Sequence, residues 1–425
     1  MIIRSARLAD REGLVDVRIE NGLITQIAER IDIPNARVYD AAGGMISPPL
    51  VDPHIHLDAV LTEGFPEPNH SGTLIEGIQR WSQRKPYLTA QDVAARAEEA
   101  LRWHVAHGVL AIRTHVDVSD PQLTALKALL SLRERVKPWV TLQIVAFPQD
   151  GIYCYPQGPE LLEEAVRLGA DVVGGIPHYE WTREDGLRDV ALAFELARRY
   201  NKAVDIHCDE TDDDHSRFLE SVANHTRLQH LEGRVTASHT TAMGSYNDAY
   251  AYKLIRILAQ TRVHIVANPL DNIVLQGRFD TYPKRRGMTR VKELIEAGIT
   301  VAAGHDSIID PWYPLGTGNQ VFVASMLAHV AHLTGSAQLP WVWQSITTAG
   351  AAVMGLESYG IQEGAPANIV VFHESTIADI LRLMPRPRWV FSHGVLIAQT
   401  PPAITTVRWG NTEREVTFTR ENISL

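Results

Sequence analysis

Residues 50–58 read Leu-Val-Asp-Pro-His-Ile-His-Leu-Asp, and this stretch decides the fold. Its apolar start is typical of a buried strand, and His54 and His56 stand two residues apart where that strand ends. Side chains two apart on a strand point to the same face, so the two imidazoles can hold one cation together. Zinc, iron and cobalt all accept imidazole ligands. Taken alone, the pair can equally be two unrelated histidines on a partly exposed strand, so the rest of the chain has to decide.

The composition is that of an ordinary globular protein, because 45% of the 425 residues are hydrophobic and 21% are charged. The formal net charge is −10 and no basic tract is present, so we expect no nucleic-acid polymer as a partner. No segment has the length and apolarity of a signal peptide or a membrane span, so we expect a cytoplasmic protein without a membrane partner. Cys154 and Cys208 are too few for a disulfide framework or a thiolate zinc site.

Short apolar runs alternate with amphipathic helical patterns through the middle of the chain. This alternation is typical of βα units, whose strands form a parallel sheet. The strand-like runs are residues 45–56, 109–115, 140–147, 172–176, 203–207, 235–239, 264–268 and 300–306. Helical spacing of apolar residues is found at 90–107, 123–135, 187–200, 250–258 and 290–297. These repeats predict an α/β fold, a (β/α)8 TIM barrel over residues 49–364.

The two ends of the chain follow a different pattern. Short β-rich segments occur at 2–8, 14–20 and 23–28, and again at 368–372, 389–392, 395–398 and 404–409. Asn21-Gly22 and His393-Gly394 are typical hairpin turns. Because the termini of a domain often lie close together, we predict that residues 1–48 and 365–425 pair into one small β-sandwich domain.

Histidine and acidic residues recur at the ends of the predicted strands. The first strand ends in His54 and His56, the fifth in His207, the sixth in His239 and the eighth in Asp306. In a barrel, side chains at the C-terminal rim converge on one cavity, and chance would rarely place these residues there. Imidazoles with a carboxylate can hold a divalent metal that lowers the pKa of a bound water, so that hydroxide is available near neutral pH.

Glu210 lies just beyond the strand-end His207, in the segment His207-Cys208-Asp209-Glu210. A carboxyl group in this position suits general acid/base chemistry on a bound substrate. The alternative is a solvated acid within the acidic run 209–214.

These motifs together resemble the amidohydrolase superfamily and, within it, the bacterial cytosine deaminases. The matching segments extend over nearly the whole chain and are residues 53–58, 113–120, 143–149, 207–210, 237–242 and 310–314. The resemblance implies an enzyme that hydrolytically deaminates a free pyrimidine base, cytosine or 5-methylcytosine, to uracil or thymine and ammonia. It also implies a small-molecule partner, and the precedent of the family favours a homo-oligomer.

The resemblance implies a role for each residue of the predicted site. One divalent metal ion, Fe2+ or Zn2+, would be bound by His54, His56, His207 and Asp306. His239 would hydrogen-bond to the attacking water and shuttle a proton. Glu210 would protonate ring nitrogen N3, and Asp306 would take the proton from the water. Imidazole and carboxylate ligands bind both Fe2+ and Zn2+ and so do not discriminate between them.

Substrate contacts follow from the same resemblance. Gln149 would pair its side chain with the O2 and N1 edge of the base, because a carboxamide offers one donor and one acceptor. Leu74 and Trp312 would form apolar walls. Two other readings stay open, in which Gln149 caps a helix and Trp312 belongs to an ordinary core.

Two features narrow the expectation. Superfamily members with two metals bridge them with a carboxylated lysine at the end of the fourth strand, and residues 172–178 contain no lysine, so we predict one metal. At this position the typical pattern of the bacterial cytosine deaminases is His-Asp-Asp, whereas this chain has His305-Asp306-Ser307. In the family the missing acid lies near ring position C5, so we expect Ser307 to leave room for a methyl group and to favour 5-methylcytosine.

Two alternatives stay open at this point. One is an aminohydrolase of another small heterocycle, isoguanine or an s-triazine, although Gln149 favours a pyrimidine edge. The other is a base-binding protein without catalytic activity, and the presence of Glu210 together with all the expected metal ligands speaks against it.

Overall fold

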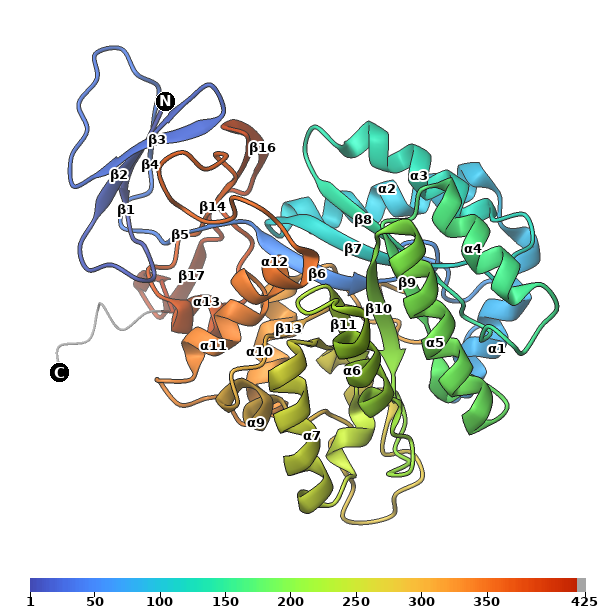
Figure 1. Cartoon of the computed structure of the whole chain (residues 1–425). Helices are drawn as coiled ribbons and strands as arrows, with labels where there is room; N and C mark the ends of the chain where they lie inside the picture. Colours follow the sequence, from blue (N-terminus) through green and yellow to red (C-terminus); the bar gives the residue numbers. More distant parts are fainter. Residues whose placement is uncertain (419–425) are drawn as a thin grey trace. The chain divides into compact units, whose positions relative to one another are not determined.

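The computed structural model describes residues 1–418. The chain folds as two compact units, one formed by Met1–Pro48 with Gly360–Leu425 and the other by Pro49–Tyr359. The larger unit carries an eight-stranded parallel sheet whose strands follow one another in chain order within the described residues (Figure 1). The strands are β6 (Leu50–Ile55), β7 (Val109–Asp117), β8 (Thr141–Phe147), β9 (Val172–Gly175), β10 (Ala203–Cys208), β11 (Val235–His239), β12 (His264–Ala267) and β13 (Val301–Ala303).

The first and last strands of this sheet meet and close it into a barrel. Ile55 forms a parallel bridge with Asp306. The backbone N–H of His56 donates to the carbonyl of Asp306 at 3.1 Å, and the N–H of Asp306 donates to the carbonyl of His54 at 2.8 Å. The predicted (β/α)8 barrel is therefore confirmed. Its strands are rich in apolar residues because a parallel sheet is covered on both faces, and every residue of β7 is buried.

Helices lie around the outside of the strands (Figure 1). They are α2 (Ala90–Ala106), α3 (Thr124–Val136), α4 (Gly158–Leu168), α5 (Arg183–Tyr200), α6 (Phe218–Gln229), α7 (Asp248–Thr261), α9 (Val291–Glu296), α10 (Gln320–Val330), α11 (Leu339–Ser345) and α12 (Thr348–Met354). Side-chain caps set several of their starts, since Thr89, Thr182 and Asn247 each accept a backbone N–H of the first helical turn. Within residues 1–418 we find no helix whose length and apolarity would allow it to cross a membrane.

Two further helices of the larger unit lie in loops that follow strands. Helix α1 (Leu74–Arg84) belongs to the long segment after β6, and helix α8 (Pro269–Leu275) follows β12 directly. The hydroxyl of Thr73 caps α1 by accepting the N–H of Glu76. Both helices contribute side chains to the site described below.

The smaller unit packs two four-stranded sheets on one core. One sheet has the order β3-β2-β1-β4 and the other β16-β15-β14-β5. The strands are β1 (Ile2–Ala6), β2 (Val15–Glu20), β3 (Leu23–Ala28), β4 (Val38–Asp40), β5 (Ile46–Ser47), β14 (Ile369–Val371), β15 (Trp389–Ser392) and β16 (Val395–Gln399). Ile3 and Val17 from the first sheet share a core with Phe391 from the second. Both ends of the chain therefore build one small β unit, as the sequence predicts, although β4 pairs with β1 in parallel.

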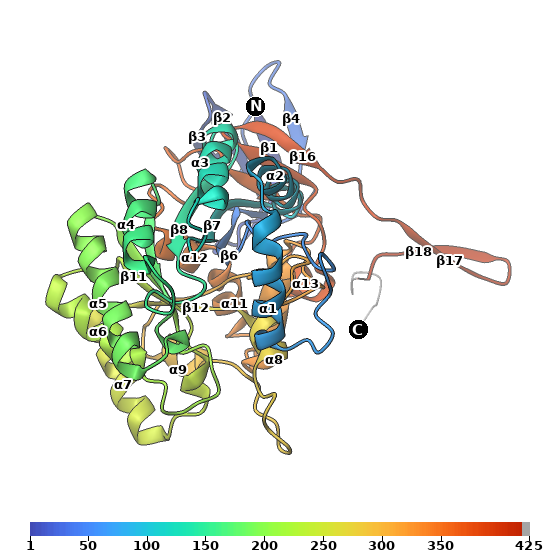
Figure 2. The same cartoon turned by 90° about the vertical axis from the view of Figure 1, so that its right-hand side faces the viewer.

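The segment 404–409 does not join these sheets. It forms β17 (Thr405–Trp409), which pairs with β18 (Thr412–Val416) as a separate two-stranded sheet (Figure 2). The prediction that this segment belongs to the sandwich is wrong. The physical reason is that these two strands have no apolar face to bury, because most of their side chains are exposed. The short helix α13 (Ile377–Leu383) lies between β14 and β15 in the chain.

Candidate active site

A cavity of about 980 Å³ lies where the barrel strands end and collects the side chains that the sequence singled out. Its lining includes His56, Leu74, Gln149, His207, Glu210, His239, Asp306, Ser307 and Trp312. His54 lies behind this lining and is fully buried. Its ring centroid is 5.5 Å from that of His56, 4.6 Å from His207 and 4.8 Å from His239. The structure thus brings every predicted site residue to one place.

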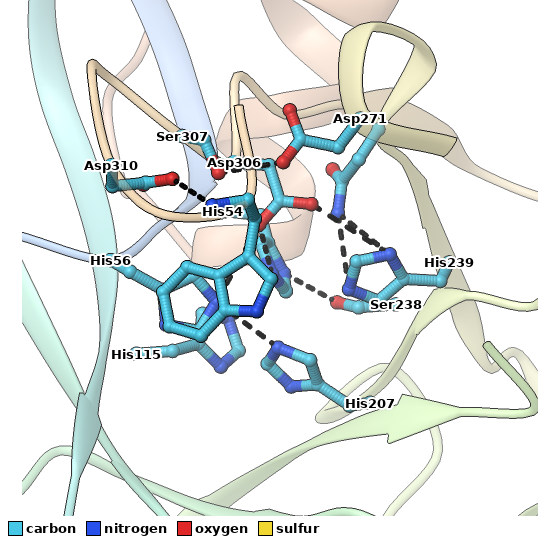
Figure 3. Close-up of polar contacts among 12 residues, drawn as sticks. His54, His56, His115, His207, Ser238, His239, Asp271, Asp306, Ser307 and Asp310 are labelled. Atoms are coloured by element: carbon cyan, nitrogen blue, oxygen red, sulfur yellow. Dashed lines mark hydrogen bonds and ion pairs between the residues drawn. The ribbon is translucent and has the colours of Figure 1, made fainter. Parts of the chain in front are cut away.

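The four proposed metal ligands form a tight cluster. Nε2 of His54 and Nε2 of His56 each lie 3.5 Å from Oδ1 of Asp306. Nε2 of His207 lies 3.2 Å from Nε2 of His56. These side chains come from β6 and the residue that follows it, from β10 and from the segment after β13, and they face one another (Figure 3).

The donor set of this cluster fits a divalent cation. Nε2 of His54, which faces Asp306, is buried without a hydrogen-bond partner among residues 1–418. Burial lowers the pKa of His54 to about 3 and that of His56 to about 4, so both rings are neutral at physiological pH. Neutral imidazoles with unshared lone pairs beside a carboxylate are the ligands that zinc and iron accept.

A chain of hydrogen bonds behind the cluster fixes the tautomer of His54. The hydroxyl of Ser238 donates to Asp205 at 2.7 Å, and the same oxygen lies 3.0 Å from Nδ1 of His54. Asp205 is also paired with Arg113 at 2.9 Å. Since the Ser238 proton is committed to Asp205, Nδ1 of His54 donates its own proton to Ser238, and Nε2 keeps its lone pair for a cation. Sequence analysis missed these three residues because they lie inside the strands.

His239 and Asp306 occupy unusual backbone positions. Their φ angles are 68° and 71°, in the left-handed region that non-glycine residues seldom adopt. Such conformations cluster at functional sites, where the surrounding structure holds them in place. The side-chain amides of Asn268 and Asn272 lie 3.3 and 3.0 Å from Nδ1 of His239. Sequence analysis missed both asparagines, although Asn268 is the last residue of a predicted strand, which was a usable signal.

Glu210 is buried beside His239, with its Oε1 3.4 Å from Nδ1 of the ring. Asp213 and Asp214, from the same acidic run, are exposed. The reading of Glu210 as a solvated acid is therefore wrong. Burial and the nearby charge of Asp306 raise the pKa of the Glu210 carboxyl well above its usual value. A carboxyl group with a raised pKa can act as a general acid.

The apolar wall of the cavity is built around Trp312. The indole packs with Leu74 and Trp81, and its centroid lies 6.0 Å from the ring of His56. Oδ1 of Asp310 holds this segment by accepting the backbone N–H of Trp312 at 3.1 Å. Gly77 of α1 packs so closely that a Cβ there would lie 2.7 Å from the indole. Trp312 therefore belongs to the cavity wall as well as to a core.

Gln149 enters the cavity just after β8. It is 6% exposed. The next helix, α4, begins after Gln157, so the alternative of Gln149 as a helix cap does not apply.

Ser307 has a partner that the sequence did not indicate. Its hydroxyl donates to Oδ2 of Asp271 at 2.6 Å. Asp271 lies on α8, and burial together with the charges of Asp306 and Asp310 raises the pKa of its carboxyl well above the usual value. Ser307 thus lies beside a carboxyl group that comes from another element.

A family model described as the amidohydrolase family matches residues 37–397. The chain belongs to this family. A 5-methylcytosine deaminase from Klebsiella pneumoniae, crystallised with 5-fluorocytosine, has a TM-score of 0.94 and 45% identity to this amidohydrolase, covering 97% of this chain and 100% of its own. The N-isopropylammelide isopropylaminohydrolase from Burkholderia multivorans ATCC 17616 has a TM-score of 0.82 and 27% identity, covering 94% and 98%. A pterin deaminase from Rhizobium rhizogenes is 30% identical over 92% of this amidohydrolase and 90% of its own length.

Proposed function

We propose that this amidohydrolase hydrolytically deaminates a free pyrimidine base, cytosine or 5-methylcytosine, to uracil or thymine and ammonia. The observation that carries the proposal is the buried Glu210 carboxyl, 3.4 Å from His239 and beside a cluster of ligands fit for a cation. The 45% identity to a 5-methylcytosine deaminase over nearly the whole chain supports the same reaction. Assembly into a homo-oligomer and a cytoplasmic location stay predictions from the sequence.

His54, His56, His207 and Asp306 would hold one divalent metal ion, Fe2+ or Zn2+. These residues would let a bound cation supply one piece of chemistry, because it would lower the pKa of a water toward neutrality. The low pKa of His54 and His56 supports this role, because ligands must be unprotonated to bind. The expectation of one metal rests on the absence of a lysine from residues 172–178.

Gln149 orients the base in this proposal. Its carboxamide offers a donor to the O2 oxygen and an acceptor to the N1–H of the pyrimidine. Trp312 and Leu74 pack on the ring and exclude water. Holding the ring in one orientation brings C4 to the proposed metal ligands and N3 to Glu210.

The proton steps use Glu210, Asp306 and His239. Glu210 donates its proton to N3, which makes C4 electrophilic. Asp306 accepts the proton of the attacking water, and His239 hydrogen-bonds to the oxygen that adds to C4. Asp306 then passes the water proton to the exocyclic amine, which leaves as ammonia. The added hydroxyl returns its proton to Glu210 as its oxygen becomes the carbonyl of uracil or thymine. One base and one water are consumed, and one uracil or thymine and one ammonia are formed, without oxidation or reduction.

Ser307 supports a preference for the methylated base. It places a small neutral side chain in the cavity wall, whereas a carboxylate would face a methyl group without solvation. One methyl-sized contact is worth about 10- to 200-fold in kcat/KM, and we expect a preference within that range.

A substrate panel with metal content measured on the same sample tests the proposal. The panel holds cytosine, 5-methylcytosine, isoguanine, N-isopropylammelide and a pterin, with ammonia release as the readout. Turnover of a pyrimidine with kcat/KM at least about 100-fold above the other compounds supports it. Turnover of only isoguanine, the triazine or the pterin would overturn it. Binding of cytosine to metal-loaded protein without ammonia release would instead identify a base-binding protein without activity.

A further inference from the structure

Asp271 and Ser307 form a hydrogen-bonded pair on the wall of the cavity. The hydroxyl oxygen of Ser307 lies 2.6 Å from Oδ2 of Asp271. Both side chains line the cavity and are almost fully buried. They come from different elements, Asp271 from α8 and Ser307 from the segment after β13 (Figure 3). The metal cluster and the proton steps do not use this hydrogen bond.

The order of the strands places the pair at one end of the substrate. Counted from β6, Gln149 follows the third strand, whereas Asp271 follows the seventh and Ser307 the eighth. The third and seventh strands of a closed eight-stranded barrel stand across its mouth from each other. In a cytosine ring C5 lies opposite C2. A base that presents its O2 and N1 edge to Gln149 therefore points C5 toward the pair.

The hydrogen bond turns the polar end of Ser307 away from the base. A serine hydroxyl has three staggered positions and keeps the one in which its proton finds an acceptor. Since the hydroxyl of Ser307 donates to Asp271, its methylene is the group left for the base. The other carboxyl oxygen of Asp271, Oδ1, is buried and has no partner in the described part of the chain. Ser307 is therefore the side chain that Asp271 holds by a hydrogen bond in this wall.

We propose that Asp271 is a positioning residue that holds the hydroxyl of Ser307 away from C5 and thereby favours a 5-methylated base over cytosine. The inference rests on the proposed pyrimidine deamination. A methyl group packed against a methylene keeps an apolar contact. A hydroxyl turned toward the same methyl group would be desolvated without a partner.

The test compares kcat/KM for 5-methylcytosine and cytosine in metal-loaded protein. Asp271→Ala removes the carboxylate that accepts the hydroxyl proton of Ser307, and we expect the ratio of the two values to fall about tenfold, the effect of one methyl-sized contact. Asp271→Asn keeps an acceptor oxygen and should retain the ratio. Asp16→Ala removes a buried carboxyl group in the smaller unit, and as the matched control it should leave the ratio unchanged.

A double-mutant cycle separates positioning from general structural support. In the Ser307→Ala background no hydroxyl remains to be held, so Asp271→Ala should no longer change the ratio. If Asp271→Ala lowers both kcat/KM values equally, or changes the ratio as strongly in that background, the positioning role is wrong. If the unmodified protein deaminates neither base, the proposed function itself fails and takes this inference with it.

Discussion

Nδ1 of His54 lies 3.0 Å from the hydroxyl oxygen of Ser238, whose own proton goes to Asp205. This contact orients the imidazole and leaves Nε2 free to bind a cation. Groups that hold a metal-binding histidine in this way often contribute substantially to affinity. The contact therefore links a residue inside β11 to a proposed metal ligand.

Ser238→Ala should weaken metal binding by about 10- to 100-fold, because His54 loses the acceptor that fixes its tautomer. The measurement is competition for the metal with a chelator of known affinity. Ser345→Ala is the matched control, since Ser345 is equally buried and its hydroxyl donates only to a carbonyl of its own helix. Equal metal affinity of the two variants would show that Ser238 does not position the ligand.

Glu210→Gln should lower kcat by about 10²- to 10⁴-fold, because glutamine cannot donate the proton that N3 needs. Substrate binding should persist, since the amide keeps the size of the side chain. Titration calorimetry with cytosine and steady-state ammonia release measure the two quantities separately. Asp213→Asn, in the exposed part of the same acidic run, is the control and should keep its turnover. Loss of binding together with turnover would assign Glu210 a structural role.

Ser307→Asp should reduce kcat/KM for 5-methylcytosine relative to cytosine by about 10- to 200-fold. The new carboxylate would face the methyl group and would lie beside Asp271, with which the wild-type hydroxyl pairs at 2.6 Å. Ser307→Asn has a similar size without the charge and separates the steric effect from the electrostatic one. A ratio unaffected by the aspartate would mean that position 307 does not face C5.

Asp310 should make the stability of the protein depend on pH. Burial raises the pKa of this carboxyl from 3.8 to about 8 in the folded state. The folded protein then binds the proton more tightly than the unfolded chain does. The contribution of Asp310 to the free energy of unfolding is therefore fully present at low pH. The free energy of unfolding should fall as the pH rises toward 8 and level off above it.

Asp310→Asn tests this dependence, because the amide oxygen can still accept the N–H groups of Trp312 and Tyr313 but does not titrate. Urea unfolding of the metal-loaded protein between about pH 5.5 and 8.5 should show a smaller slope for the variant. Parallel slopes for the two proteins would place the titrating group elsewhere.

The barrel and the strand-end residues could be predicted because their signals are local. Strands of a covered parallel sheet leave apolar runs such as β13, and polar residues that follow them stand out against that background. The positions of His207 and His239 follow directly from the ends of two such runs. No knowledge of packing is needed for that step.

Other parts depend on contacts between distant segments and leave no local signal. Asp271 lies on a short helix and reads as an ordinary polar residue until the fold buries it against Ser307. Asp205 and Ser238 point inward from strands, where a single polar residue resembles an interruption of the apolar run. The strand 404–409 was identified, but a β pattern alone cannot say which neighbour it pairs with.

The backbone bridge between β6 and Asp306 also has a consequence for the synthesis of the protein. His54 and His56 leave the ribosome early, whereas Asp306 follows only after most of the barrel has been synthesised. A cation bound by the proposed ligands would therefore find its full set only after Asp306 has left the ribosome. We expect a product truncated before Asp306 to lack the carboxylate of that set.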